Sequence, residues 1–343
     1  MANSKLELIE LTKVFLNRSD LIQGPGGNTS VKNSDGEMFI KASGFRFDEM
    51  TIEKGISAVN YLNIRNYFNL VKPIDKIQEE AEMLKIVSQN ILIDDNGEVF
   101  PRPSMETGFH AVLEQYVVHT HSVWTNLINC RSDKSNLINK LSQQFNIAEI
   151  PFVSPGFGLS YLVTDALKQS ELAGKNRPDI FLLHNHGVIA HSNSINHCVK
   201  LLLDLDKAIM DILGIQQSYP STEIVGIDGE WIPKSDYVNQ LLLKYKSDAE
   251  FFEQVLFPDQ TVFFKDQILF NQSENTRKIS INNFNVVYHC EHRDAKAIHE
   301  TMTAYLFIFD FLHSNSAEID FIGKSEIDYI NNMDMEKHRK SIK

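Results

Sequence analysis

Two histidines separated by one residue are the clearest candidates for chemistry in this sequence. His119 and His121 lie in the apolar, β-branched stretch 117–123. Side chains two apart on a strand point to the same face, so both imidazoles would share one side while Thr120 points away. Imidazole binds zinc and other first-row divalent ions. An isolated His-x-His is more often a pair of hydrogen-bonded histidines, and the spacing alone leaves both interpretations open.

A second histidine pair, His184 and His186, follows another apolar stretch. Burial of an imidazole there costs roughly 1 to 3 kcal/mol unless the ring has a partner, and a metal ion is one such partner. Gly187 would allow another backbone or a ligand to approach closely. We therefore take His186 as the candidate third ligand and His184 as an outer or surface histidine on the same face.

Glu106 is the candidate proton carrier. It falls in the first turn of an expected helix, where the helix dipole already favours an acidic residue. The functional alternative places its carboxylate beside a metal, where it would move a proton to and from carbon.

The glycine-rich stretch 24–30 would expose consecutive backbone N–H groups, and Ser43, Gly44 and Ser104 add hydroxyls and a second turn. Together these residues could form a phosphate-binding nest, although each is a weak signal alone. The loop has neither the GxxxxGK[ST] pattern of a P-loop nor the GxGxxG pattern of a dinucleotide fold. We therefore expect no nicotinamide cofactor.

The elements that must position these residues mix helices and strands, which favours a sheet with helices packed on it. Ser4 and Glu7 have capping-box spacing at the start of the first helix. The expected helices are 4–17, 104–115, 134–146, 160–171 and 196–213, and the expected strands are 29–32, 37–42, 117–123 and the apolar run 180–190.

Periodicity lapses over residues 214–237, where proline and glycine accumulate, and this predicts two domains, 1–218 and 219–343. The second would be a smaller α/β unit. Its histidines at 289 and 292 flank a cysteine and a glutamate, but adjacent strand residues face opposite ways, so we expect packing and not a metal site. Its expected strands are 261–264, 267–270 and 285–289, and its expected helices are 295–312 and 325–337, the last capped by Ser325.

Amino-acid composition limits the binding partners and the cellular compartment that we expect for this protein. The 343 residues carry 45 acidic and 33 basic side chains, a formal net charge of −12 that disfavours nucleic acid. Three cysteines without framework spacing indicate a reducing compartment. The sequence shows no signal peptide, and its longest nearly apolar run, 304–312, is too short to cross a membrane. We expect a cytoplasmic protein without membrane or nucleic-acid partners.

Taken in order, five motifs resemble the class II aldolase/adducin family, the group of fuculose-phosphate and rhamnulose-phosphate aldolases. They are Gly27-Asn28-Thr29-Ser30, Ala42-Ser43-Gly44, Pro103-Ser104-Met105-Glu106, His119-Thr120-His121 and Leu183-His184-Asn185-His186-Gly187. The likeness spans roughly residues 5–215. It implies a layered sandwich whose central, mainly antiparallel sheet is flanked by helices, with a smaller C-terminal α/β unit added.

The resemblance also implies roles. His119, His121 and His186 would be metal ligands and Glu106 the catalytic acid/base. The phosphate of the substrate would bind at Gly27, Asn28, Ser43, Gly44 and Ser104.

Residues 153–157, 256–260 and 325–328 are similar to the aldolase half of long bifunctional aldolase/dehydrogenase proteins. Three features depart from these families. Met105 stands where the small aldolases have a second hydroxyl, residues 151–159 contain no tyrosine to protonate the leaving aldehyde, and no dinucleotide loop is present.

The implied function is a metal-dependent lyase that reversibly cleaves a ketose 1-phosphate to dihydroxyacetone phosphate and an aldehyde. The resemblance implies a divalent metal, zinc first with cobalt or manganese as alternatives, no NAD, and a homo-oligomer with a tetramer favoured. A dehydratase, epimerase or decarboxylase on the same scaffold is the alternative, because fold does not determine function. A non-catalytic adducin-like binding protein is a third alternative, which would not require the histidines and Glu106.

Overall fold

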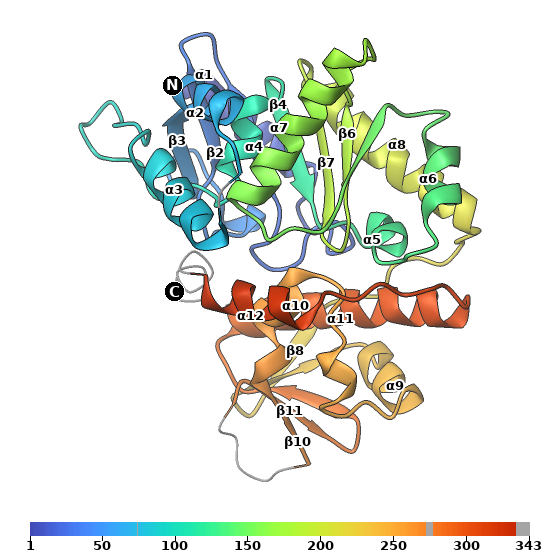
Figure 1. Ribbon diagram of the computed structural model, residues 1–343. Coiled ribbons are helices and arrows are strands. Elements are labelled where there is room, and N and C mark those ends of the chain that lie inside the picture. The colour runs from blue at the N-terminus through green and yellow to red at the C-terminus, as the bar shows by residue number, and fades with distance from the viewer. Residues whose placement is uncertain (74, 272–276, 334–343) are drawn as a thin grey trace.

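A seven-stranded sheet organises the first two thirds of the chain (Figure 1). The computed structural model describes residues 1–73, 75–271 and 277–333. Neighbouring strands pair antiparallel except β5 and β6, which are parallel. In spatial order the strands are β3 (Ile56–Asn60), β2 (Glu37–Lys41), β1 (Asn28–Lys32), β4 (Tyr116–Thr120), β7 (Gly187–Ser192), β6 (Ile180–Leu183) and β5 (Ile147–Ile150).

Helices cover both faces of this sheet, because successive strand residues feed two different cores. Val117 and Ile189 pack with one group of helices, and their neighbours Val118 and Val188 pack with the other. The first group is α2 (Tyr61–Leu70), α3 (Lys76–Ser88), α4 (Thr107–Val112) and α7 (Phe157–Leu172); the second is α1 (Ala2–Lys13), α5 (Val123–Asn129), α6 (Ser135–Leu141) and α8 (Ile195–Leu213). The expected layered sandwich with a mainly antiparallel sheet is confirmed.

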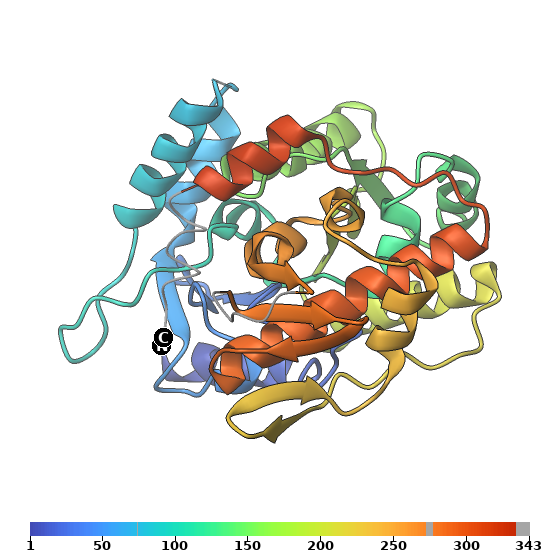
Figure 2. The same ribbon diagram turned by 90° about the horizontal axis from the view of Figure 1, so that it is seen from below.

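The rest of the chain builds a smaller α/β unit around α11 (His292–Ser314). This helix lies between the two sheets and contacts α5 on one side and β8 and β9 on the other (Figures 1 and 2). The second sheet has the order β10 (Ile268–Phe270), β11 (Ile279–Asn282), β12 (Asn285–Tyr288), β9 (Glu230–Pro233), β8 (Ile224–Ile227). Its other helices are α9 (Tyr237–Lys244), α10 (Pro258–Phe263) and α12 (Lys324–Asn332), with short 3-10 helices at Phe47–Glu49, Phe251–Glu253 and Lys265–Gln267.

The last strand of the first sheet ends at residue 192, and the first strand of the second sheet begins at residue 224. The expected boundary at residue 218 falls between them. One apolar core nevertheless includes Leu8 and Val118 of the first unit and Phe252, Ile281 and Tyr305 of the second. The division into domains at residue 218 therefore stays a prediction.

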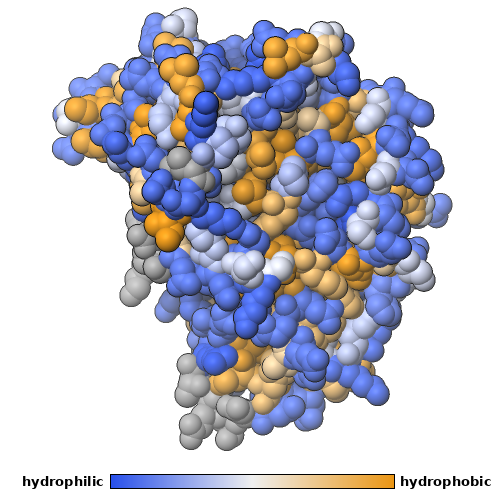
Figure 3. Space-filling model, viewed as in Figure 1, coloured by the Kyte–Doolittle hydropathy of each residue, from blue (hydrophilic) through white to orange (hydrophobic). Residues whose placement is uncertain are grey.

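No helix in the described part of the chain is long and apolar enough to cross a membrane. Hydrophilic residues cover most of the face seen in Figure 3, with apolar patches between them.

Several expected elements differ in the structure. Residues 261–263 belong to helix α10 and not to a strand, and Phe264 caps that helix, because Pro258 opens a helix at its first position. The run 180–190 is two strands, β6 and β7, joined by a turn. Residue 123 starts α5, and the helices expected at 104–115 and 134–146 are shorter.

Neither expected cap forms: α1 begins after Met1 and α12 after Gly323, both without a side-chain cap. Residues 334–337 of the last expected helix lie outside the described residues.

Candidate metal centre

Three buried histidines meet where β4 ends and β7 begins. His119 is the fourth residue of β4, His121 follows the strand, and His186 precedes β7. The antiparallel register pairs Thr120 with Val188, which brings the two strand ends together. The three rings offer nitrogen atoms that all lie within 4.8 Å of one another. The expected ligand set is therefore assembled in one place.

Close backbone packing at Gly187 makes this possible. A Cβ on Gly187 would lie 2.2 Å from the carbonyl oxygen of Thr120, far inside van der Waals contact. The expected close approach at this glycine is confirmed. We expected His184 and His186 to share one face of a strand, but both lie in the turn between β6 and β7. His184 Nε2 lies 3.1 Å from the Glu149 carboxylate, away from the other three histidines.

The ring orientations of His119 and His121 favour metal binding. His119 Nδ1 lies 3.0 Å from the carbonyl oxygen of Val188, and His121 Nδ1 contacts the carboxylate of Asp259. A carbonyl oxygen and an ionised carboxylate only accept hydrogen bonds, so these contacts favour a proton on each Nδ1 and a lone pair on each Nε2. The two Nε2 atoms face each other at 3.1 Å. Two facing lone pairs repel, and a cation between the rings would remove that repulsion, so the donor set fits a divalent metal.

Burial lowers the pKa of His119 to about 4, against an opposing effect of the nearby Glu106 carboxylate. The ring is therefore neutral at neutral pH, which is the form that binds metals.

Glu106 is buried beside the histidines and immediately precedes α4. Its Oε2 lies 3.5 Å from His119 Nε2, and its Oε1 lies 3.6 Å from His186 Nε2. The side chain makes no capping hydrogen bond to the helix, so capping does not explain its position. Oε1 accepts no hydrogen bond from the residues that the structure describes. A buried carboxylate oxygen without such a bond, beside the three imidazoles, is suited to exchange a proton with a bound molecule.

The five residues expected to bind phosphate line one pocket, together with Glu106, His121 and His186. Gly27 and Gly44 adopt positive φ of 61° and 77°, the left-handed conformation that forms anion-binding nests. The expected phosphate residues in this lining are Gly27, Asn28, Ser43, Gly44 and Ser104.

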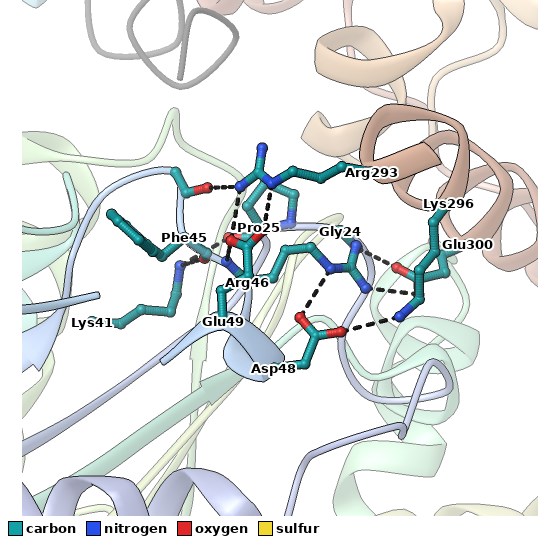
Figure 4. Close-up of polar contacts among 11 residues, drawn as sticks. Gly24, Pro25, Lys41, Phe45, Arg46, Asp48, Glu49, Arg293, Lys296 and Glu300 are labelled. Carbon is teal, nitrogen blue, oxygen red and sulfur yellow. Dashed lines mark hydrogen bonds and ion pairs between the residues drawn. The ribbon is translucent and has the colours of Figure 1, made fainter. Parts of the chain in front are cut away.

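Lys41 belongs to the same lining but was missed in the sequence. Its ammonium donates to the carbonyl oxygens of Pro25, at 3.0 Å, and Phe45, at 2.8 Å, and so joins the two loops that form the pocket (Figure 4). A lysine that ends an otherwise apolar strand next to Ala42-Ser43-Gly44 was the available signal.

Helix α11 holds the same two loops from the side of the second unit (Figure 4). The Glu300 carboxylate accepts from the backbone N–H of Gly24 at 2.8 Å and from the Arg46 guanidinium at 2.9 Å. About two turns nearer the start of the same helix, Arg293 donates to the carbonyl oxygen of Gly44 at 2.7 Å. We call Arg46, Arg293 and Glu300 the loop clamp.

The histidines of the second unit do not converge. His289 contacts Glu230 at 2.9 Å, and the His292 ring packs on Trp231 with centroids 4.6 Å apart. Within the described residues the metal-ligand geometry is met by His119, His121 and His186. The expected packing role of this motif agrees with these contacts.

Comparison with known proteins identifies a family for the first part of the chain. The family described as class II aldolase and adducin N-terminal domain matches residues 7–212. Uncharacterized oxidoreductase YuxG from Bacillus subtilis (strain 168) is 24% identical over 187 residues, and the match covers 52% of this chain and 25% of YuxG. The chain thus spans about a quarter of that curated relative's length.

Several solved structures are similar to this chain in fold, with low sequence identity to it. The N-terminal class II aldolase domain of a conserved protein from Thermoplasma acidophilum is similar over 60% of this chain and 92% of that chain, with 21% identity and a TM-score of 0.49. L-fuculose-1-phosphate aldolase from Thermus thermophilus is similar over 62% and 95%, with 16% identity and a TM-score of 0.40. Because the family match extends over more than half of its residues, this chain belongs to the class II aldolase and adducin family.

Proposed function

We propose that the protein is a metal-dependent lyase that reversibly cleaves a ketose 1-phosphate to dihydroxyacetone phosphate and an aldehyde. The observation that carries the proposal is the position of Glu106, whose two carboxylate oxygens lie 3.5 Å and 3.6 Å from the Nε2 atoms of His119 and His186. This position, beside two of the three candidate ligands, supports a proton carrier acting next to a bound metal. A non-catalytic protein of this family would need neither.

His119, His121 and His186 would hold the metal, with zinc first and cobalt or manganese as alternatives. A divalent ion there supplies a Lewis acid that stabilises negative charge developing on the substrate carbonyl oxygen. The chain's own contribution is to hold the three rings with their Nε2 atoms inward.

Glu106 would carry the proton between its carboxylate and the carbon next to the carbonyl. Asn28 supports this role, since its amide donates to Glu106 Oε2 at 2.7 Å and leaves Oε1 toward His186. The departing aldehyde needs a proton donor, and residues 151–159 contain no tyrosine for that step.

Gly27, Asn28, Ser43, Gly44 and Ser104 would bind the phosphate through backbone N–H groups and hydroxyls. Lys41 adds positive charge to the same lining. Binding energy from the phosphate, which does not react, would hold the reacting carbons near Glu106.

We infer a cytoplasmic homo-oligomer, a tetramer first, that binds no NAD. Family membership supports the assembly, and the free thiols of Cys130, Cys198 and Cys290 agree with a reducing compartment. Light scattering at micromolar concentration tests the assembly, and a monomer would contradict it.

A retro-aldol screen tests the activity. The protein is supplied in turn with zinc, cobalt or manganese and a panel of ketose 1-phosphates, and dihydroxyacetone phosphate is measured. We expect metal-dependent release from at least one sugar. Dehydrated, epimerised or decarboxylated product without dihydroxyacetone phosphate would assign one of the alternative reactions, and no reaction with any metal would refute the lyase.

A further inference from the structure

One segment of the second unit, residues 254–260, packs directly beneath the candidate metal centre. The Gln260 side chain ties the segment to itself, donating to the carbonyl oxygen of Gln254 at 2.9 Å and accepting from the N–H of Leu256 at 3.0 Å. Pro258 then starts α10, whose second residue is Asp259. These hydrogen bonds and the start of α10 hold the backbone of the segment, and that backbone positions the side chain of Asp259.

The Asp259 carboxylate contacts Nδ1 of His121, and its residue is only 1% exposed. The two side chains fill the space beside Gly26. A Cβ on Gly26 would come within 2.8 Å of His121 Nδ1 and 3.0 Å of an Asp259 carboxylate oxygen. A larger residue at position 26 would collide with the His121–Asp259 pair, so the glycine of this loop leaves room for the pair.

The same segment also holds the turn that carries His186. Asn185 occupies a left-handed conformation with φ of 53°, and its amide donates to the carbonyl oxygens of Leu256, at 3.0 Å, and Asp320, at 2.8 Å. Both acceptors belong to the second unit. Two of the three histidines are thus positioned by residues more than 70 positions further along the chain.

We propose that the second unit is a structural part of the metal centre and that Asp259 is the positioning residue through which it sets the affinity for metal. The proposal rests on the metal site of the proposed function. Asp259 keeps the His121 proton on Nδ1, so that Nε2 is the ligand atom, and its charge makes that nitrogen a stronger donor. An amide in its place would lack the charge. It would also no longer fix the tautomer, because its NH₂ group can donate to Nδ1, which leaves the proton on Nε2, as well as its oxygen can accept from Nδ1–H.

The test compares Asp259→Asn with the wild-type chain in full length. Cobalt(II) affinity is measured by competition with a chelator of known affinity, and the cobalt absorption spectrum reports the ligand geometry. We expect the variant to bind cobalt about 10- to 100-fold more weakly, with an altered spectrum. Asp266→Asn is the matched control, since Asp266 lies seven positions further along and its side chain is 63% exposed. The control should bind cobalt as the wild type does.

Unchanged cobalt affinity and spectrum in Asp259→Asn would overturn the proposal. A wild type that binds none of zinc, cobalt and manganese would instead contradict the metal site of the proposed function. The wild type thus tests the metal site, and the comparison with the variant tests the role of Asp259.

A second measurement needs no variant at position 259 and no metal. In the metal-free wild type labelled with ¹⁵N-histidine, long-range ¹H–¹⁵N correlation identifies the protonated nitrogen of each ring, and His121→Gln assigns the signal. We expect the His121 proton on Nδ1. A proton on Nε2 would overturn the proposal even where Asp259→Asn does not fold.

Discussion

At the residue scale, Asn28 is more than a phosphate-binding candidate. Its amide donates to Glu106 at 2.7 Å and to Ser104 Oγ at 3.1 Å, while its oxygen contacts His110. His110 in turn lies 2.7 Å from Ser30 Oγ. With its side chain engaged in this way, Asn28 would reach a phosphate through its backbone N–H, and its amide would orient the proton carrier.

Glu106→Gln tests the proton carrier. The change keeps the shape of the side chain and removes the titrating group, so we expect turnover to fall on the order of 10² to 10⁴-fold with metal content unchanged. Deuterium exchange at the carbon next to the carbonyl of dihydroxyacetone phosphate is the measurement, since it needs no aldehyde. Equal exchange in both proteins would assign the proton transfer to another base.

We expect Asp206 to make the stability of the protein depend on pH. Burial raises the pKa of this carboxyl to about 8, against the opposing hydrogen bond from Ser122. A raised pKa means that the fold favours the protonated form, a stabilisation that is full below the unfolded pKa near 4 and is lost as pH rises toward 8. We expect this carboxyl to lower the free energy of unfolding by up to about 1.4 kcal/mol per pH unit across that range.

Urea unfolding at pH 5 and pH 8 measures this effect. Asp206→Asn removes the group that titrates and should lose less stability between the two pH values than the wild type does. Asp204→Asn, on the same helix with a 46% exposed side chain, is the control. The same loss in Asp206→Asn and the wild type would show that other groups cause the pH dependence.

At the scale of elements, the loop clamp connects α11 to both loops of the candidate phosphate site. Arg46 and Glu300 are 8% and 4% exposed, so their ion pair is largely shielded from water. Arg46 also contacts Asp48 at 3.2 Å, which itself pairs with Lys296 at 3.0 Å nearer the surface. The effects of breaking the buried Arg46–Glu300 pair and the outer Lys296–Asp48 pair can therefore be compared in the same protein.

Glu300→Gln should loosen the clamp. The amide keeps only one acceptor oxygen and no charge, so either Arg46 or the Gly24 N–H loses its buried partner, and we expect the free energy of unfolding to fall by about 1 to 3 kcal/mol. Inorganic phosphate should bind more weakly in calorimetry, while cobalt affinity stays unchanged because Glu300 does not contact the histidines.

Lys296→Met is the matched control, since it breaks an outer ion pair whose side chains are 32% and 36% exposed. Pairs of this kind contribute about 0 to 1 kcal/mol, and phosphate binding should be retained. Loss of phosphate binding in both variants, or in neither, would contradict the role of the clamp.

At the scale of the whole molecule, one apolar core spans both units, and Asp259 of the second unit contacts the candidate ligand His121. We therefore expect a single calorimetric unfolding transition for the full chain. Removing metal with a chelator should lower its midpoint without splitting it, because a ligand present at 100 times its dissociation constant stabilises the fold by about 2.7 kcal/mol. Two transitions, or a midpoint that a chelator does not move, would show that the units unfold independently or that no metal is bound.

Local patterns predicted a sheet with helices packed on it and the histidines that could bind a metal, and the resemblance to a known family implied the layered arrangement and the full set of pocket residues. His119 and His121 share a face because strand residues two apart always do, and Gly187 marked a close approach because only glycine tolerates one. The helix at 196–213 was predicted well by its amphipathic period, and it ends at Gly214 with a left-handed φ of 67°. Such features depend on neighbours a few positions apart, which a sequence displays directly.

The tertiary structure alone decided which distant residues complete the site. Asp259 meets His121 across 138 positions and Glu300 meets Gly24 across 276, and no periodicity records contacts of that span. Residues 261–264 are β-branched and aromatic, which predicts a strand. The first three nevertheless end helix α10, because Pro258 opens a helix there and packing against α11 overrides a weak local preference. The sequence thus determined the inner residues of the site, and the packing of the second unit on the first decided what holds them in place.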